Sequence, residues 1–306
     1  MSIGWVAGAS RARAMTTRRV GREGARALAA GPSLDAAVRT LAHGPYAGTV
    51  HEGATLADAQ RGAVATALWN CRVLAGWVPR DGVAVLRVLA GTVEAINVVD
   101  HVRRLAGATT PPALHLGALS TSWPRVAATT TADGVRQALT ASPWGDPGGT
   151  TAAEIDAALR VSLADRVLAA APDAGPWAAG AVALLVAREA AHGRRPGPGA
   201  RQPVARVLGR PALHAGSVEE LAAVVPSSAR WALAGVTGPE DLWRAEARWW
   251  SRVDDDGSRL VRRTTAGPAV LLGTVAMLAA DAWRVRAALE VADRGPTALG
   301  VLDEVA

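Results

Sequence analysis

The residues that most often bind metals or act in catalysis are sparse in this sequence and form no recognisable pattern. The chain has one cysteine, Cys71, so it can form neither an internal disulfide nor a cysteine-rich zinc site. No two histidines have the spacing of four residues that zinc peptidases use on a helix. We therefore expect no metal ligands. The histidines are His43, His51, His101, His115, His192 and His214.

Motifs for phosphate binding and nucleophilic catalysis are also missing. The 306 residues include no lysine, which excludes a Walker A lysine and a Schiff-base lysine. The glycines of 193–199 neither follow a predicted strand nor open a clear helix, as a phosphate-binding loop must. The acidic run 254–256 is followed too soon by Gly257 to be a calcium loop. The sequence predicts no catalytic residue and no cofactor, and hence a protein that is not an enzyme.

Arginine supplies the entire basic charge of the chain, whose formal net charge is +6. Six arginines stand between residues 11 and 26, where Glu23 is the single acid. Such a segment is typical of a helix that contacts nucleic acid or an acidic partner, although many basic helix faces simply lie in solvent. An arginine-rich helical protein that binds nucleic acid is therefore one candidate function.

Apolar residues repeat at helical spacing, whereas the alternation expected of strands is scarce. Pro268 suits the first turn of a C-terminal helix, and Thr151 with Glu154 forms a capping-box signature before another helix. Helix starts are also expected at Ser217 and Thr237, the latter helix ending near Gly257. The clearest apolar stripe is Leu271, Val275, Leu278, Ala282, Val285 and Leu289. The sequence predicts an all-α fold.

Turn-forming residues divide the chain at three places. The adjacent prolines at 111–112 interrupt helix propagation, and 143–149 is rich in proline and glycine. We interpret 193–211, which holds four prolines, as a mobile linker or long loop. The predicted units are three small helical bundles, at 1–110, 111–210 and 211–306. No signal peptide is expected, and the longest apolar runs are shorter than a membrane span requires.

An arginine-bearing helix recurs about once in each third of the chain. The copies are 9–15, 94–105 and 281–289, and each places arginine among small or apolar residues. In this order the chain resembles the C-type central-stalk subunit of V/A-type ATPases, the counterpart of the eukaryotic d-type subunit. Residues 11–15 are similar to that family's N-terminal Ala-Arg-x-Arg-Ala-Met stretch. The spacing from Asn97 to Arg103, and that from Asp281 to Arg286, are similar to its two later arginine helices. Residues 114–119 after the paired prolines also fit, whereas the centre, 125–230, matches poorly.

The resemblance implies three similar helical bundles that form a funnel with a pseudo-threefold arrangement. In that family the funnel is a non-catalytic central-stalk subunit of a rotary, proton-translocating ATPase. It couples the rotating shaft to the membrane proteolipid ring, on the cytoplasmic face of the membrane. The expected partners are therefore the shaft subunits and the ring, without nucleic acid. Because guanidinium groups pair well with carboxylates, we expect Arg11, Arg13, Arg103 and Arg286 to lie at interfaces between bundles or subunits.

Overall fold

A computed structural model describes residues 3–295, and every regular element among them is a helix. The all-α prediction is confirmed. The chain forms two compact units, one from residues 1–83 and 250–306 and the other from 84–249. These units cut across the three ranges expected from the sequence. The first unit joins two segments that are far apart in the sequence, whereas the second is continuous.

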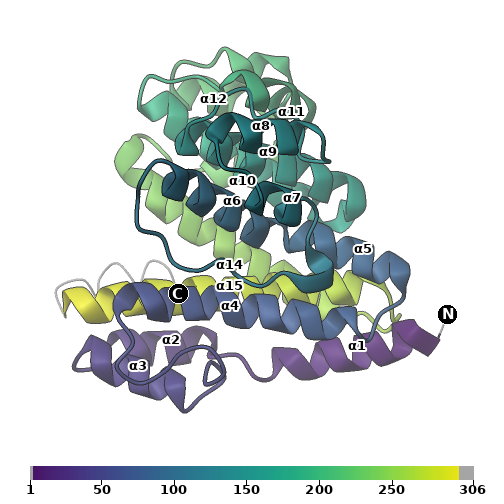
Figure 1. Cartoon of the computed structure of the whole chain (residues 1–306), viewed down its shortest axis with the longest axis vertical. Coiled ribbons are helices and arrows are strands. Elements are labelled where there is room, and N and C mark those ends of the chain that lie inside the picture. The colour runs from purple at the N-terminus through teal and green to yellow at the C-terminus, as the bar shows by residue number, and fades with distance from the viewer. Residues whose placement is uncertain (1–2, 296–306) are drawn as a thin grey trace. The chain divides into compact units, whose positions relative to one another are not determined.

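In the first unit, a long C-terminal helix packs against helices from the N-terminal part of the chain (Figure 1). This helix, α15, is Pro268–Arg294, with its proline in the first turn as predicted. It contacts α1, α2, α3 and α4, and apolar side chains of α2, α3, α4 and α15 form one core. The bounds are α1 Ile3–Thr16, α2 Gly21–Ala29, α3 Leu34–Ala42 and α4 Leu56–Ala75. By length and hydropathy α15 could cross a membrane, but 72% of its most apolar window is buried inside the protein.

Helix α14, Leu242–Val261, passes through the acidic run at which the sequence predicted its end. The reason lies in its contact with α15. A Cβ on Gly257 would lie 2.9 Å from the carbonyl oxygen of Gly273, and a Cβ on Gly273 would lie 2.5 Å from that of Gly257. The two glycines thus let the backbones of α14 and α15 touch. Gly257 serves this helix contact and does not end the helix.

The second unit is built around α9, which packs against α6, α10 and α11. It holds two hydrophobic clusters, one between α6 and α9 and one between α9 and the start of α14. The helices are α6 Gly91–Leu105, α7 Trp123–Ala127, α8 Ala132–Thr140, α9 Ala152–Ala170, α10 Gly175–Ala191, α11 Pro198–Leu208, α12 Val218–Val224 and α13 Ser227–Arg230; α5, Arg80–Leu89, runs from the first unit into the second. Short 3₁₀ turns lie at Gly117–Leu119, Pro172–Ala174, Arg210–Leu213, Trp231–Leu233 and Pro239–Asp241.

Local signals in the sequence predicted several helix ends correctly. Thr151 and Glu154 form the expected capping box, and Ser217 accepts from the backbone N–H of Glu220. The linker expected at 193–211 is wrong, because α11 occupies most of it. Pro198 stands in the first turn of α11, where its missing N–H costs no helical hydrogen bond.

Candidate functional site

A buried carboxylate fastens three segments of the first unit together. Asp281 of α15 is 2% exposed and accepts hydrogen bonds from the backbone N–H groups of Val20, at 3.1 Å, and Gly21, at 2.7 Å. These groups lie at the start of α2, where a helix has unpaired donors and favours negative charge. The hydroxyl of Tyr46 donates to the same carboxylate at 2.9 Å. Burial raises the pKa of Tyr46 far above its usual range, and the charge of Asp281 raises it further, so the phenol stays a donor.

The second unit contains the same arrangement. Glu94 of α6 is fully buried, and its Oε1 accepts from the backbone N–H groups of Thr121, Ser122 and Trp123 at 2.9, 2.7 and 2.6 Å. These residues lead into α7. The indole N–H of Trp144 donates to Oε2 at 3.2 Å. In both units, then, an acid on a long helix binds the start of a short helix and an aromatic donor from a later turn. We call each arrangement a carboxylate clamp.

The clamps share further features of sequence. Ser33 caps α3 and stands 13 residues before Tyr46, and Thr131 caps α8 and stands 13 residues before Trp144. Ser217 caps α12 in the same way and stands 14 residues before Trp231. The segment from Ser217 to Trp231 therefore repeats the capped helix and the following aromatic residue. The indole N–H of Trp231 donates instead to the backbone carbonyl of Ser228.

A second polar residue follows each clamp acid by three positions. The Asn97 side chain both donates to and accepts from the backbone of Leu114, each at 2.8 Å, and so fixes the segment after α6. Arg284 is 1% exposed and donates to Asp254 at 2.9 Å. Asp254 also accepts from Arg19 at 2.8 Å, so one carboxylate neutralises a buried cation and ties the chain before α2 to α14.

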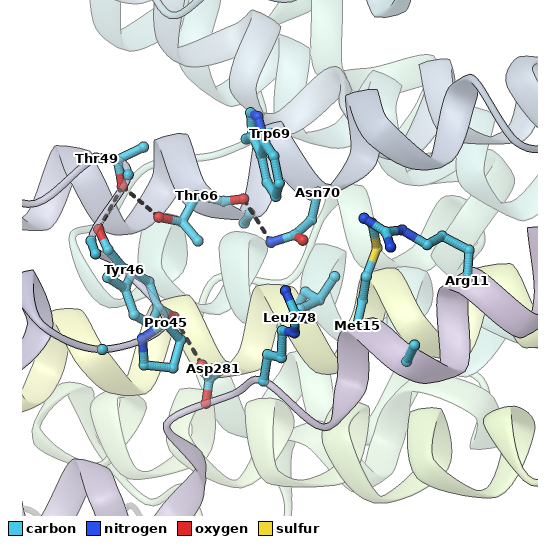
Figure 2. A pocket seen from close by; sticks show the side chains of 16 residues that line it. Arg11, Met15, Pro45, Tyr46, Thr49, Thr66, Trp69, Asn70, Leu278 and Asp281 are labelled. Carbon is cyan, nitrogen blue, oxygen red and sulfur yellow. Dashed lines mark hydrogen bonds between the residues drawn. The ribbon is translucent and has the colours of Figure 1, made fainter.

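Beside the Asp281 clamp lies a cavity of about 540 Å³, wholly within the first unit (Figure 2). Its walls come from α1, the turn after α3, α4 and α15. Figure 2 shows Arg11 and Met15 on one side and Trp69 and Asn70 on another. Most of the wall is apolar. The lining residues are Arg11, Ala14, Met15, Arg18, Gly44, Pro45, Tyr46, Ala47, Gly48, Thr49, Thr66, Ala67, Trp69, Asn70, Leu278 and Asp281.

The charged residues that line this cavity are Arg11, Arg18 and Asp281, and the Asp281 carboxylate is already hydrogen-bonded to the protein. Within residues 3–295, neither Arg11 nor Arg18 forms an ion pair or a side-chain hydrogen bond with another protein group. The Nε of Arg11 is buried without an acceptor in that part of the chain, while its guanidinium carbon lies 5.9 Å from the ring centre of Trp77. Asp281 already accepts three hydrogen bonds. The cavity thus offers positive charge to a ligand.

The four arginines predicted from the sequence lie in different surroundings. Arg11 lines the cavity. Arg13 donates to two backbone carbonyls at and beyond the end of α14, that of Val261 at 3.2 Å and that of Arg263 at 2.7 Å. Arg103 is exposed and lies 3.7 Å from Asp100, one turn earlier on α6. Arg286 is exposed on α15. Arg11, Arg13 and Arg286 thus have different surroundings within the first unit, and Arg103 belongs to the second unit.

No group of three or more histidine, cysteine, aspartate or glutamate side chains is placed to hold a metal ion anywhere in residues 3–295. The clamp acids are satisfied by hydrogen bonds to the protein, and their role here is to hold segments together. Sequence reasoning placed Glu94 and Asp281 in its repeat without assigning them this role. One signal in the sequence could have indicated the role, namely an acid among apolar residues of a predicted helix. Such an acid is expected to be buried, and a buried carboxylate needs hydrogen-bond donors from other segments.

The chain's sequence matches no known protein-family model, and no curated protein is significantly similar to it.

Proposed function

We propose that the chain is a non-catalytic central-stalk subunit of a V/A-type rotary ATPase, which couples the rotating shaft to the membrane proteolipid ring. In this proposal it consists of three similar helical bundles in a funnel with a pseudo-threefold arrangement. It lies peripherally on the cytoplasmic face of the membrane, and its partners are the shaft subunits and the ring.

The observation that carries the proposal is the recurrence of one local design. The carboxylate clamp occurs in each unit, and a capped helix followed by an aromatic residue occurs a third time after Ser217. The three copies coincide with three hydrophobic clusters among the described residues. A repeated bundle is what the resemblance to the V/A-type ATPase family implies. The proposal extends this internal repetition to the full funnel.

The chemistry of the described residues is in keeping with a mechanical role. A coupling protein must transmit torque without yielding, and buried ionic hydrogen bonds between distant segments resist local opening. Asp281 is 235 positions from Tyr46, and Glu94 is 50 positions from Trp144, so each clamp joins parts of the chain that are far apart in sequence.

The nucleic-acid alternative receives less support. Of the arginines between 11 and 26, Arg19 and Arg22 pair with acids of α14, and Arg13 donates to backbone carbonyls. These contacts remove three cations from a continuous phosphate-binding surface.

Affinity purification from the native membrane fraction tests the proposal. A tagged chain is expected to recover the catalytic subunits, the shaft subunits and the proteolipid of a V/A-type ATPase. Replacing Arg11 and Arg13 together with alanine should reduce that recovery while leaving the helical spectrum intact, and Arg26→Ala, an exposed change on α2, serves as the matched control. Repeated recovery of the tagged chain alone under mild conditions would rule the proposal out.

A further inference from the structure

The cavity of the first unit has the size and lining of a small-molecule site. Its volume of about 540 Å³ lies within the range of roughly 300–1,000 Å³ that is typical of pockets for organic ligands. Its wall is mostly apolar, with a few polar groups, as in such pockets. The hydrogen bonds of the Asp281 clamp hold the surrounding helices without filling this space, so the cavity requires a separate explanation.

The charge of the cavity selects an anion. Arg11 lies on α1 and Arg18 lies two residues beyond its end at Thr16, and both line the cavity. Other arginines of the first unit, such as Arg19, Arg22 and Arg284, pair with Asp254 or Asp255. Arg11 and Arg18 have no such acid within residues 3–295.

The negative charge of Asp281 does not cancel this preference. Its carboxylate accepts from two backbone N–H groups and from Tyr46. These donors stabilise the carboxylate, and it lies near the positive N-terminal end of α2. A phosphate group carries close to two negative charges at neutral pH, which matches two guanidinium groups better than a single carboxylate does.

The rest of the wall favours a ligand with a flat apolar body. Trp69 is 52% exposed, and its ring extends from α4 toward the cavity (Figure 2). An indole face binds planar rings by stacking, and such contacts tolerate differences between rings. Met15 and Leu278 supply further apolar surface. The cavity is also far larger than an inorganic ion needs.

We propose that this cavity binds a small organic phosphate ester that carries a planar ring, with Arg11 and Arg18 on the phosphate and Trp69 on the ring. A nucleoside monophosphate is the simplest member of this class. The site is distinct from the coupling role, because binding can be measured on the isolated chain whether or not the chain assembles with an ATPase.

Isothermal titration of the full chain with AMP tests the proposal. AMP is expected to bind saturably. Ribose 5-phosphate, which lacks the planar adenine ring, and adenosine, which lacks the phosphate, should each bind about tenfold more weakly or not at all. Affinity for AMP should fall as NaCl is raised, since salt screens the arginines. Equal binding of adenosine and AMP would overturn the role of the arginines.

Single variants locate the site. Arg11→Gln and Arg18→Gln should each weaken AMP binding about tenfold, the loss expected for a charge-assisted hydrogen bond. Trp69→Leu should weaken it severalfold. The controls are Arg26→Gln on α2 and Trp243→Leu in the second unit, neither of which lines the cavity. Circular dichroism confirms that each variant is folded. Unchanged affinity in the cavity variants, or an equal loss in the controls, would refute the site.

A membrane lipid could present the same phosphate chemistry, and a vesicle arm separates the two sources. Vesicles of phosphatidylglycerol in phosphatidylcholine should not compete with AMP. Binding to these vesicles that depends on Arg11 and Arg18, without binding of AMP, would assign the arginines to a lipid surface and overturn the proposal.

Discussion

Replacing Glu94 with alanine should destabilise the second unit more than any single surface change. The Glu94 carboxylate accepts three backbone N–H groups and the indole N–H of Trp144. Each buried donor left without an acceptor costs about 1–3 kcal/mol of stability. Water that fills the space left by the side chain can accept from some of these donors, which reduces the total cost. The guanidinium carbon of Arg166 lies 4.4 Å from the ring centre of Trp144. Glu94 is the negative charge that acts on Arg166, so the alanine variant would leave this arginine without its counterion. Burial lowers the pKa of Arg166, while Glu94 raises it. We expect a total loss of about 3–5 kcal/mol, as for a broken buried ion pair.

Urea unfolding, followed by circular dichroism and by tryptophan fluorescence, measures this loss. Glu94→Gln retains one carbonyl oxygen for the three backbone donors, so it should cost about 2 kcal/mol less than Glu94→Ala. Glu219→Ala, an exposed change in the same unit, should stay within about 0.5 kcal/mol of the parent chain. A loss below about 1 kcal/mol for Glu94→Ala, or equal losses for the alanine and glutamine variants, would show that the clamp does not stabilise the unit as reasoned.

Other variants probe the first unit. Gly273→Ala should destabilise by about 1–3 kcal/mol, because its Cβ would lie 2.5 Å from a carbonyl oxygen of α14; a melting temperature equal to the parent's would contradict this. Asp254→Ala should cost about 3–5 kcal/mol in urea unfolding because it leaves Arg284 buried and unpaired, whereas Asp255→Ala, which removes an exposed pair, should cost less than about 1 kcal/mol. Burial raises the pKa of Cys71 to about 12, so iodoacetamide at about pH 8 should modify it only as fast as the unit opens, and rapid labelling of folded protein would refute its burial.

Local signals were sufficient to predict the helical class and several helix ends. The stripe from Leu271 to Leu289 lies on α15, and the Thr151 capping box opens α9. Proline and glycine content predicted helix boundaries wrongly at two places, 193–211 and Gly257. Proline and glycine near 193–211 indicated a loop, but proline in a first turn begins α11. Gly257 indicated a helix end, but its lack of a side chain permits a helix crossing.

The site was less accessible to sequence reasoning than the fold. Arg11 was a candidate from the outset, yet its neighbours in the cavity include residues of α4 and α15 that no spacing rule connects to it. The clamp acids were visible as residues, but their donors lie up to 261 positions away. Backbone N–H groups occur at nearly every position, so the sequence does not show which of them an acid will bind.

The discontinuous first unit has a consequence for how the protein is made. A nascent chain that has reached residue 249 contains the whole of the second unit, so that unit can fold during synthesis. The first unit must wait, because α15 supplies much of its core and the Asp281 carboxylate that Val20 and Gly21 bind. Until α15 has been synthesised, the apolar faces of α2, α3 and α4 lack the helix that covers them. Helices α2, α3 and α4 therefore wait longer for their packing partner during synthesis than the helices of the second unit do.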